Sequence, residues 1–225
     1  MSPKILIGLP AYNESKIIGD VVSRLFDKGY SNVLVVDDAS SDDTAKKARN
    51  VGAEVIVHEE NKGAGGATKT ILRYAREEGF DYLVLMDGDG QHDPRDIKKL
   101  LGFKDEFDFV LGVRDFKASG VPFTRRVANW IGNVVTWVFF GKYVRDSQSG
   151  FKLLNKAAIG KVRISFDRYE FCSELIGEAK RHGLRLKQVP IRTIYTDHSK
   201  SKGQSVFEGF KMVWRMMKKQ WFGKI

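Results

Sequence analysis

Short apolar runs alternate with amphipathic segments over the first hundred residues, and few architectures accept such an order. Four runs have the length and the Val, Ile and Leu content of buried strands: Ile5–Leu9, Val33–Val36, Glu54–Val57 and Tyr82–Met86. The three segments between them have apolar residues at helical spacing, and a glycine follows each: Ser15–Lys28, Asp42–Val51 and Ala64–Glu78. This order predicts an α/β fold with a mainly parallel sheet and helices on both faces.

The pattern changes after Asp96, but the later segments can still extend the same sheet. Further strands are predicted at Asp108–Val113, in "GFKLL" from Gly150 and in "LRLKQVPIRTIY" from Leu184, and helices at Thr124–Phe140, Phe171–His182 and Val206–Phe222. No repeat, low-complexity tract or linker interrupts the chain. We therefore expect one domain over residues 1–205, followed by a C-terminal helix at residues 206–225.

Polar sequences follow each of the first four predicted strands. They read "PAYNE", "DDASSDD", "NKGAGG" and "DGDGQHD" in chain order. In open parallel sheets, ligands bind in the crevice outside the carboxyl ends of the strands. The sequence therefore predicts that these four loops line a single crevice.

The fourth loop has the composition of a divalent-metal site. Asp87 and Asp89 offer carboxylates and Gln91 an amide oxygen, which suit Mg²⁺ or Mn²⁺ when phosphate and water complete the coordination. A calcium-binding EF-hand loop is excluded, because it requires a glutamate at its twelfth position, where Lys98 stands. Asp93 is predicted to cap the helix that follows Pro94.

The second and third loops each allow two interpretations. "NKGAGGATKT" fails as a phosphate-binding P-loop and as a dinucleotide fingerprint at Thr68. It remains a glycine-rich helix start beside Lys62, where free N–H groups favour anions, or where Gly65 and Gly66 permit close packing. In "VVDDAS", a carboxylate of Asp37 or Asp38 accepts hydrogen bonds from a ribose or a base, or Asp38 or Ser40 serves in capping and turn formation.

Charge and cysteine content restrict the partners and the compartment. The net charge is +10, of which +6 lies in residues 199–225, so an anionic partner is expected. Acids at four strand ends repel nucleic-acid phosphate, which argues against a nucleic-acid-binding module. Cys172 is the single cysteine, so no intrachain disulfide forms and a reducing, cytoplasmic location is expected.

Membrane contact is expected without a membrane span. No apolar stretch approaches the roughly 20 residues that cross a bilayer, and the N-terminal apolar run is too short for a signal peptide. The C-terminal helix has one apolar stripe beside basic residues, a pattern typical of interfacial helices: Phe207, Phe210, Trp214, Met217 and Trp221. Packing on the domain or on a partner membrane protein is the alternative. Residues 126–140 form either a second interfacial helix or part of the core.

The four early motifs together resemble the nucleotide-sugar half of glycosyltransferase family 2. They read "GLPAYNE" from Gly8, "VVDDASSDDT" from Val35, "NKGAGGA" from Asn61 and "MDGDGQHDP" from Met86. "DSQSGFKLL" from Asp146 and the segments from Tyr169 and Tyr195 are similar to the polyprenyl-phosphate sugar synthases of that family. The resemblance extends to about residue 205 and implies the Rossmann-like GT-A fold, mixed and mainly parallel.

Roles for individual residues follow from this resemblance. Residues 1–105 would bind the nucleotide sugar, UDP- or GDP-linked, and residues 106–205 the acceptor. The nucleotide-sugar contacts would be Pro10, Tyr12, Glu14, Asp37, Lys62, Asp87, Asp89 and Gln91, with Asp87, Asp89 and Gln91 facing the metal. Asp89, Arg114 and Arg126 would be catalytic, while Gln148, Ser201 and Lys202 would bind the acceptor, together with Lys200. Arg125 would form a surface ion pair.

The implied reaction is an inverting, Mg²⁺- or Mn²⁺-dependent transfer of a sugar to a dolichyl or undecaprenyl phosphate. The enzyme would act peripherally at the cytoplasmic face of a membrane, with or without a small membrane protein partner. The family's "ED" base is absent from the comparable Tyr169–Cys172 stretch. A phosphate acceptor needs no base, whereas the alternative, a sugar or small hydroxyl acceptor, would require Glu170 or Glu174 as one.

Overall fold

The computed structural model of the protein describes residues 3–115, 123–192 and 194, and only the backbone of residues 123–125. Seven strands form one sheet: β1 (Ile5–Ala11), β2 (Val33–Asp37), β3 (Glu54–Val57), β4 (Tyr82–Leu85), β5 (Phe109–Arg114), β6 (Lys152–Asn155) and β7 (Leu186–Ile191). The helices are α1 (Ile18–Asp27), α2 (Thr44–Asn50), α3 (Gly63–Glu77), a 3₁₀ turn η1 (Pro94–Asp96), α4 (Ile97–Leu101), α5 (Phe123–Phe140), α6 (Lys156–Lys161) and α7 (Glu170–Arg181). Lys200, Ser201, Lys202 and the predicted helix at residues 206–225 lie outside the described residues.

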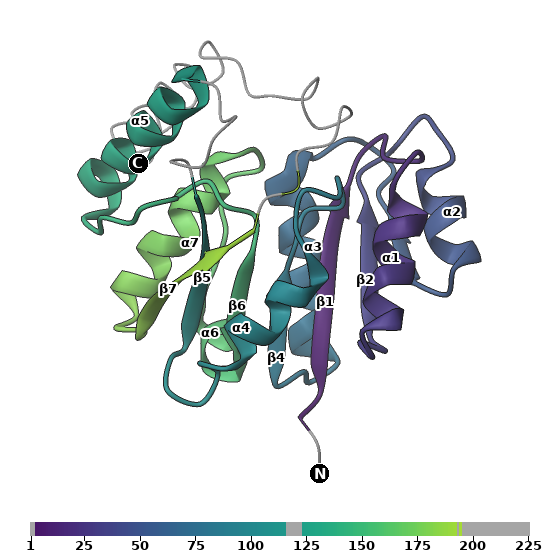
Figure 1. Cartoon of the computed structure of the whole chain (residues 1–225), viewed down its shortest axis with the longest axis horizontal. Coiled ribbons are helices and arrows are strands. Elements are labelled where there is room, and N and C mark those ends of the chain that lie inside the picture. The colour runs from purple at the N-terminus through teal and green to yellow at the C-terminus, as the bar shows by residue number, and fades with distance from the viewer. Residues whose placement is uncertain (1–2, 116–122, 193, 195–225) are drawn as a thin grey trace.

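The sheet is mixed and mainly parallel, as predicted, with strand order β3-β2-β1-β4-β6-β5-β7 (Figure 1). The four N-terminal strands are parallel, and β5 is parallel to β7. β6 runs antiparallel to both β4 and β5, which places Lys152 beside Leu85 on one side and Leu111 on the other. β6 therefore joins the N-terminal and C-terminal parts of the chain in one sheet.

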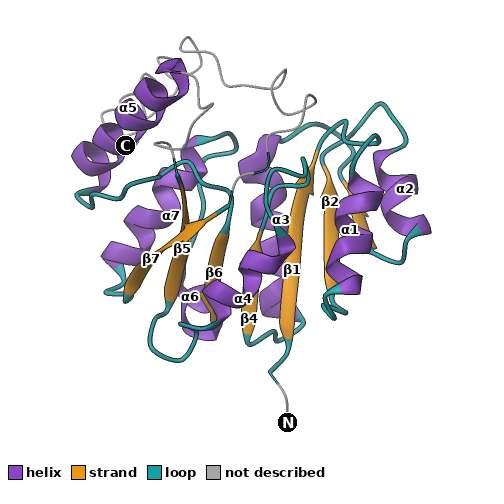
Figure 2. Ribbon diagram, viewed as in Figure 1, coloured by secondary structure: helices purple, strands orange, loops and turns teal. Residues whose placement is uncertain are grey.

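Helices cover both faces of the sheet, which Figure 2 shows as purple layers around the orange strands. On one face, α1, α2 and α4 pack on a core that includes Ile7, Val35 and Val84. On the other, α3, α6 and α7 pack on a core that includes Leu34 and Leu83. Neighbouring residues of one strand thus enter opposite cores, because side chains alternate along a strand. This arrangement explains the continuously apolar strand sequences.

The predicted elements agree closely with those observed. The first four strands were predicted with ends that differ by no more than two residues. Asp93 accepts a hydrogen bond from the Arg95 backbone N–H at 2.9 Å and caps η1, as predicted. The short helix α6 was not predicted, although Asn155 caps it by accepting from Ala158 N at 3.0 Å. Six residues are too few for a visible helical period.

The long helix α5 lies outside the two layers and packs against α7 (Figure 1). Asn133 and Thr136 are buried, and Thr136 Oγ1 lies 2.8 Å from Ser173 Oγ on α7. On its other side, the side chains of Trp130 and Trp137 are exposed. Residues 126–140 therefore pack on the domain and also keep an apolar face in solvent. None of the helices in the described part of the chain combines the length and apolarity needed to cross a bilayer.

The N-terminus of α3 packs against the loop before α7. Gly65 N and Gly66 N donate to the carbonyl of Asp167 at 2.7 and 3.2 Å. A methyl group at Gly65 would overlap the carbonyl of Phe166 and approach the Asp167 carbonyl carbon to 2.7 Å. Close packing therefore explains the glycine at position 65, although the contact is with a loop.

We expect Gly65→Ala to lower the free energy of unfolding by about 1–3 kcal/mol, because the added methyl group overpacks this junction. The control is Gly160→Ala in α6, where the new methyl group would have no heavy atom within 4 Å. That change should raise the free energy of unfolding by up to about 1 kcal/mol. Denaturant titration measures both, and equal stabilities of the two variants would contradict the packing.

Candidate functional site

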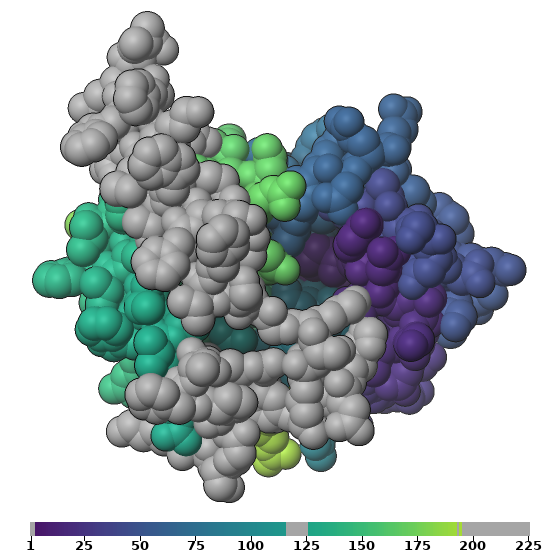
Figure 3. Space-filling model, turned by 90° about the horizontal axis from the view of Figure 1, so that it is seen from above, coloured from purple at the N-terminus to yellow at the C-terminus, as the bar shows by residue number. Residues whose placement is uncertain are grey.

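The polar loops after the N-terminal strands meet at the carboxyl edge of the sheet, as predicted. Asp38 N donates to Ala11 O at 2.9 Å, which joins the loop after β2 to the end of β1. Gly88 N donates to Pro10 O at 3.3 Å, which joins the loop after β4 to the same strand. Figure 3 looks onto this edge and shows a depression between the purple and blue N-terminal elements and the green segment before α7.

Asp87 and Asp89 form the centre of this region. Asp89 accepts from Gln91 N at 2.9 Å and from Gln91 Nε2 at 2.5 Å. Asp87 Oδ2 lies 3.2 Å from His92 Nε2, and the Asp87 side chain is 43% exposed whereas that of His92 is 2% exposed. A methyl group at Gly150 would overlap the Asp87 carboxylate, so only glycine permits this approach.

The two carboxyl groups differ in acidity. Partial removal from water would by itself raise the pKa of Asp87, but the hydrogen bond from His92 and the charges of His92, Lys152 and Arg114 lower it overall. Burial raises the pKa of Asp89, and the nearby Asp87 carboxylate raises it further. Two acids held this close repel each other, and a bound cation would relieve that repulsion.

The donors at this position fit a magnesium or manganese ion that is shared with a phosphate. Such ions use one or two carboxylates and take their remaining ligands from phosphates and water. Within the described residues, no group of three or more His, Cys, Asp or Glu side chains could hold a metal. Asp87 and Asp89 would therefore supply only part of the coordination of a metal ion. Gln91 donates a hydrogen bond to Asp89 from its amide nitrogen.

Arg114 adds a fixed positive charge beside the acids. It ends β5, and its Nε and Nη2 donate to Asp146 Oδ2 and Oδ1 at 2.7 and 2.8 Å. Arg114 N also donates to Asp146, whose side chain is fully buried, while that of Arg114 is 22% exposed. The bidentate pair holds the guanidinium in one orientation. The positive charge of Arg114 is one of the causes that lower the pKa of Asp87.

Asp38 organises the start of α3. Asp38 accepts from Lys62 N at 2.9 Å, Gly63 N at 2.6 Å and the His58 ring at 2.7 Å. With the Gly65 and Gly66 N–H groups engaged as well, the structure favours close packing over an anion site as the interpretation of this loop. Asp37 is buried and accepts from Ser40 N at 3.2 Å. The Lys62 side chain is exposed.

Residues after β1 lie next to the acids. Glu14 is buried, and its negative charge contributes to the raised pKa of Asp89, after burial and Asp87. Glu14 N donates to Thr44 Oγ1 at 2.8 Å, which fixes this turn to α2. Pro10 is partly buried and Tyr12 is 48% exposed. Glu14 therefore shares the acid cluster, and Tyr12 is accessible from solvent.

Some of the residues predicted to bind the acceptor lie in the described part of the chain. Gln148 lies between α5 and α7, donates to Ser173 Oγ at 3.0 Å and has a buried amide oxygen without a described hydrogen-bond donor. Arg126 is exposed on α5. Glu174 accepts from Ser165 N and Phe166 N at 2.9 and 3.0 Å, so it orients the loop before α7.

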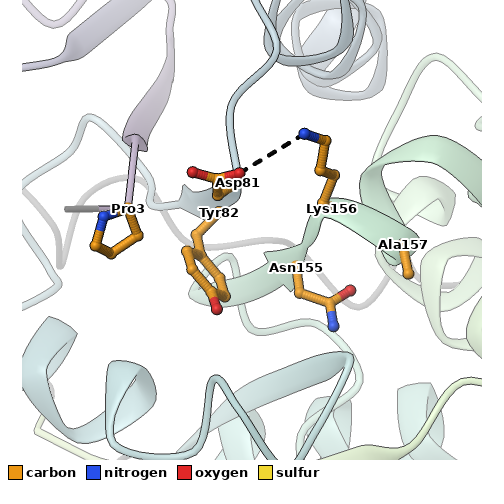
Figure 4. A pocket seen from close by; sticks show the side chains of 6 residues that line it. All are labelled: Pro3, Asp81, Tyr82, Asn155, Lys156 and Ala157. Atoms are coloured by element: carbon orange, nitrogen blue, oxygen red, sulfur yellow. Dashed lines mark ion pairs between the residues drawn. The ribbon is translucent and has the colours of Figure 1, made fainter. Parts of the chain in front are cut away.

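Two polar hollows in the described part of the molecule are lined by residues other than Asp87 and Asp89. One, of about 320 Å³, is at the opposite edge of the sheet, where Lys156 Nζ lies 3.7 Å from Asp81 (Figure 4). The other, of about 430 Å³, is lined by Glu60, Asn61, Lys62, Asp167 and Arg168. Neither contains Asp87 or Asp89, so the chemistry of the acid cluster identifies the site better than the shape of the surface.

The sequence predicts no role for Asp146 or Gly150, although both lie in the "DSQSG" motif. The available signal was an aspartate next to small residues before a predicted strand. The role of Asp146 depends on Arg114, which lies 32 residues away in the sequence. The role of Gly150 depends on its contact with Asp87. No local pattern indicates such partners.

Comparisons with known proteins identify the family of this chain. The model of the family described as Glycosyl transferase family 2 matches residues 6–163. A UDP-N-acetylglucosamine–dolichyl-phosphate N-acetylglucosaminyltransferase from Methanococcus voltae is 38% identical, over 95% of this chain and 94% of that protein. An undecaprenyl-phosphate mannosyltransferase from Micrococcus luteus is 32% identical, over 88% of this chain and 87% of that protein.

A solved structure shares the fold. Glucosyl-3-phosphoglycerate synthase from Mycobacterium tuberculosis, in complex with Mn²⁺ and UDP-glucose, matches with a TM-score of 0.72. The match covers 97% of this chain and 78% of that chain, at 18% identity. The GT-A architecture expected from the sequence is thereby confirmed.

We expect Asp146→Asn to weaken the binding of a nucleoside diphosphate by at least about tenfold, because Arg114 loses its charged bidentate partner. Calorimetry with UDP and GDP in the presence of Mn²⁺ measures the change. The matched control is Asp108→Asn, which removes the Asp108–Arg185 pair at the other end of β5. Equal affinities of the two variants would contradict an orienting role for Asp146.

Proposed function

This chain belongs to glycosyltransferase family 2, and we propose that it transfers a sugar from a nucleoside-diphosphate sugar to a polyprenyl phosphate at a membrane surface. The reaction would require Mg²⁺ or Mn²⁺ and invert the anomeric centre. The similarity to the Methanococcus voltae dolichyl-phosphate enzyme over almost the full length of both chains carries this proposal. The Micrococcus luteus relative, named for undecaprenyl phosphate, supports the same class of acceptor.

Asp87 and Asp89 would hold the metal, with Gln91 beside Asp89. When bound, the metal would act as a Lewis acid that offsets negative charge on the diphosphate of the donor. The structural relative with Mn²⁺ and UDP-glucose supports both a divalent ion and a nucleoside-diphosphate donor. Residues of the β1 and β2 loops, Tyr12, Glu14 and Asp37 among them, would then bind the nucleoside.

The chemistry requires that two anions approach each other. An oxygen of the acceptor phosphate would attack the anomeric carbon while the bond from that carbon to the nucleoside diphosphate breaks, and the electron pair leaves with the diphosphate. Arg114, held by buried Asp146, would stabilise the charge that develops on this leaving group. Arg126, exposed on α5, would meet the acceptor phosphate, and Gln148, between α5 and α7, would also contact the acceptor.

A phosphate acceptor is anionic at neutral pH and needs no general base. This fits the engagement of Glu174, which accepts hydrogen bonds from the loop at residues 165–166. Glu170 is buried, with 1% of its surface exposed. A hydroxyl acceptor with a glutamate base is the alternative, and the partition of the product between organic solvent and water distinguishes the two.

The decisive experiment incubates the protein with Mn²⁺ or Mg²⁺, a polyprenyl phosphate and labelled UDP- or GDP-sugars. We expect label from one donor to enter the organic phase and Asp89→Ala to lower turnover by at least about a hundredfold, because metal-bound charge stabilisation contributes several kcal/mol. Exposed Asp105, at the far edge of the sheet, provides the control Asp105→Ala. Full turnover by Asp89→Ala would contradict the assignment of Asp89 as a metal ligand. Label that remains in the aqueous phase would favour the hydroxyl acceptor.

Helix α5 supports contact with the membrane surface. Trp130 and Trp137 lie two turns apart and are 62% and 56% exposed, and Val138 is 65% exposed. Tyr143 beyond the helix is exposed too. Exposed Trp side chains on one helix face are typical of interfacial helices, in which the aromatic rings enter the headgroup region. The cytoplasmic face is proposed because nucleotide sugars and a reduced cysteine suit that compartment.

We expect the double change Trp130→Ser and Trp137→Ser to reduce co-sedimentation with anionic liposomes by at least about fivefold, since each buried aromatic ring contributes on the order of 1–3 kcal/mol. Val57→Ser, which removes an exposed apolar residue on β3, should leave binding unchanged. Equal binding by both variants and the unmodified protein would exclude α5 from the membrane contact.

A further inference from the structure

Lys152 is an unusual residue for the centre of a sheet. Its side chain is fully buried on β6, although lysine is almost never fully buried unless paired. Its ammonium donates to Ser149 O, lies 3.6 Å from Cys172 Sγ and lies 5.7 Å from the centre of the Phe171 ring. No carboxylate forms an ion pair with Lys152 in the part of the chain that the structure describes. These neutral partners do not cancel its charge.

The position of Lys152 in the sheet brings its charge close to the acid cluster. Lys152 pairs with Leu85 across the β4–β6 ladder, and Asp87 follows two residues after Leu85. The segment that leads into β6 also contacts Asp87, because Gly150 packs directly against the Asp87 carboxylate. The ammonium of Lys152 donates to the carbonyl of Ser149, the residue directly before Gly150.

Lys152 differs from Arg114, the other fixed cation near these acids. The charge of Arg114 is balanced by the buried carboxylate of Asp146, with which it forms two hydrogen bonds. Lys152 has no such ion pair among the described residues, and its burial keeps water from screening its charge. Electrostatic interactions in such surroundings are several times stronger than in water. Lys152 should therefore repel any cation that binds at Asp87 and Asp89.

We propose that Lys152 is a fixed internal counter-charge that weakens the binding of a divalent cation by itself, so that the metal is held firmly only together with the diphosphate of the donor. The inference rests on the proposed function, because it assumes the metal-diphosphate site. The donor's diphosphate supplies the negative charge that Lys152 offsets.

The test measures Mn²⁺ binding to the full chain without nucleotide, at pH 8, from the electron paramagnetic resonance signal of free Mn²⁺. We expect Lys152→Met to bind Mn²⁺ about tenfold more tightly than the unmodified protein, as removal of one nearby positive charge implies. Lys152→Gln should change in the same direction, and it keeps a donor for Ser149 O. Leu154→Met, a neutral change at a buried position of the same strand face, should leave the affinity unchanged.

The same titration is repeated with UDP and with GDP. If Lys152→Met and Lys152→Gln bind Mn²⁺ no more tightly than the unmodified protein, while all three bind it with a nucleotide, this inference fails and the proposed function stands. If the unmodified protein binds no Mn²⁺ with either nucleotide, the metal site fails, and both proposals fail with it. Tighter nucleotide-free binding by both variants, but not by Leu154→Met, supports the counter-charge.

Discussion

The structure depends on holding two like charges, Asp87 and Asp89, at the end of the central strand β4. Burial and the nearby Asp87 carboxylate raise the pKa of Asp89, so surrounding groups must stabilise the ionised pair. Hydrogen bonds from Gln91 and His92 provide part of this stabilisation, and the charges of Lys152 and Arg114 lower the pKa of Asp87. Apolar packing on both faces of the sheet keeps these groups in place.

The second part of the chain completes a site that the first part begins. The antiparallel strand β6 enters between β4 and β5 and brings Gly150 against the Asp87 carboxylate. The neighbouring strand β5 ends at Arg114, which the Asp146 carboxylate orients. In a purely parallel continuation of the sheet, the segment before β6 would not reach this edge. The mixed topology therefore has a direct chemical consequence.

The fold was largely predictable because apolar periodicity is local. Strand lengths, the helices between them and the polar loops at the strand ends were all visible in the sequence. The role of the loop "NKGAGG" was harder to predict, because its backbone N–H groups could donate either to a ligand or to other parts of the protein. Asp38 and the Asp167 carbonyl use those of Lys62, Gly63, Gly65 and Gly66, and these partners come from other loops.

By itself, the sequence determined the order of strands and helices and the residue types at the crevice, since both depend on short-range patterns of apolar and polar residues. Tertiary structure alone decided which charges are balanced. Arg114 and Lys152 are both basic residues in strand sequences, yet one faces a buried carboxylate and the other a carbonyl, a thiol and an aromatic ring. Long-range contacts set that difference, because charge balance depends on distances in space.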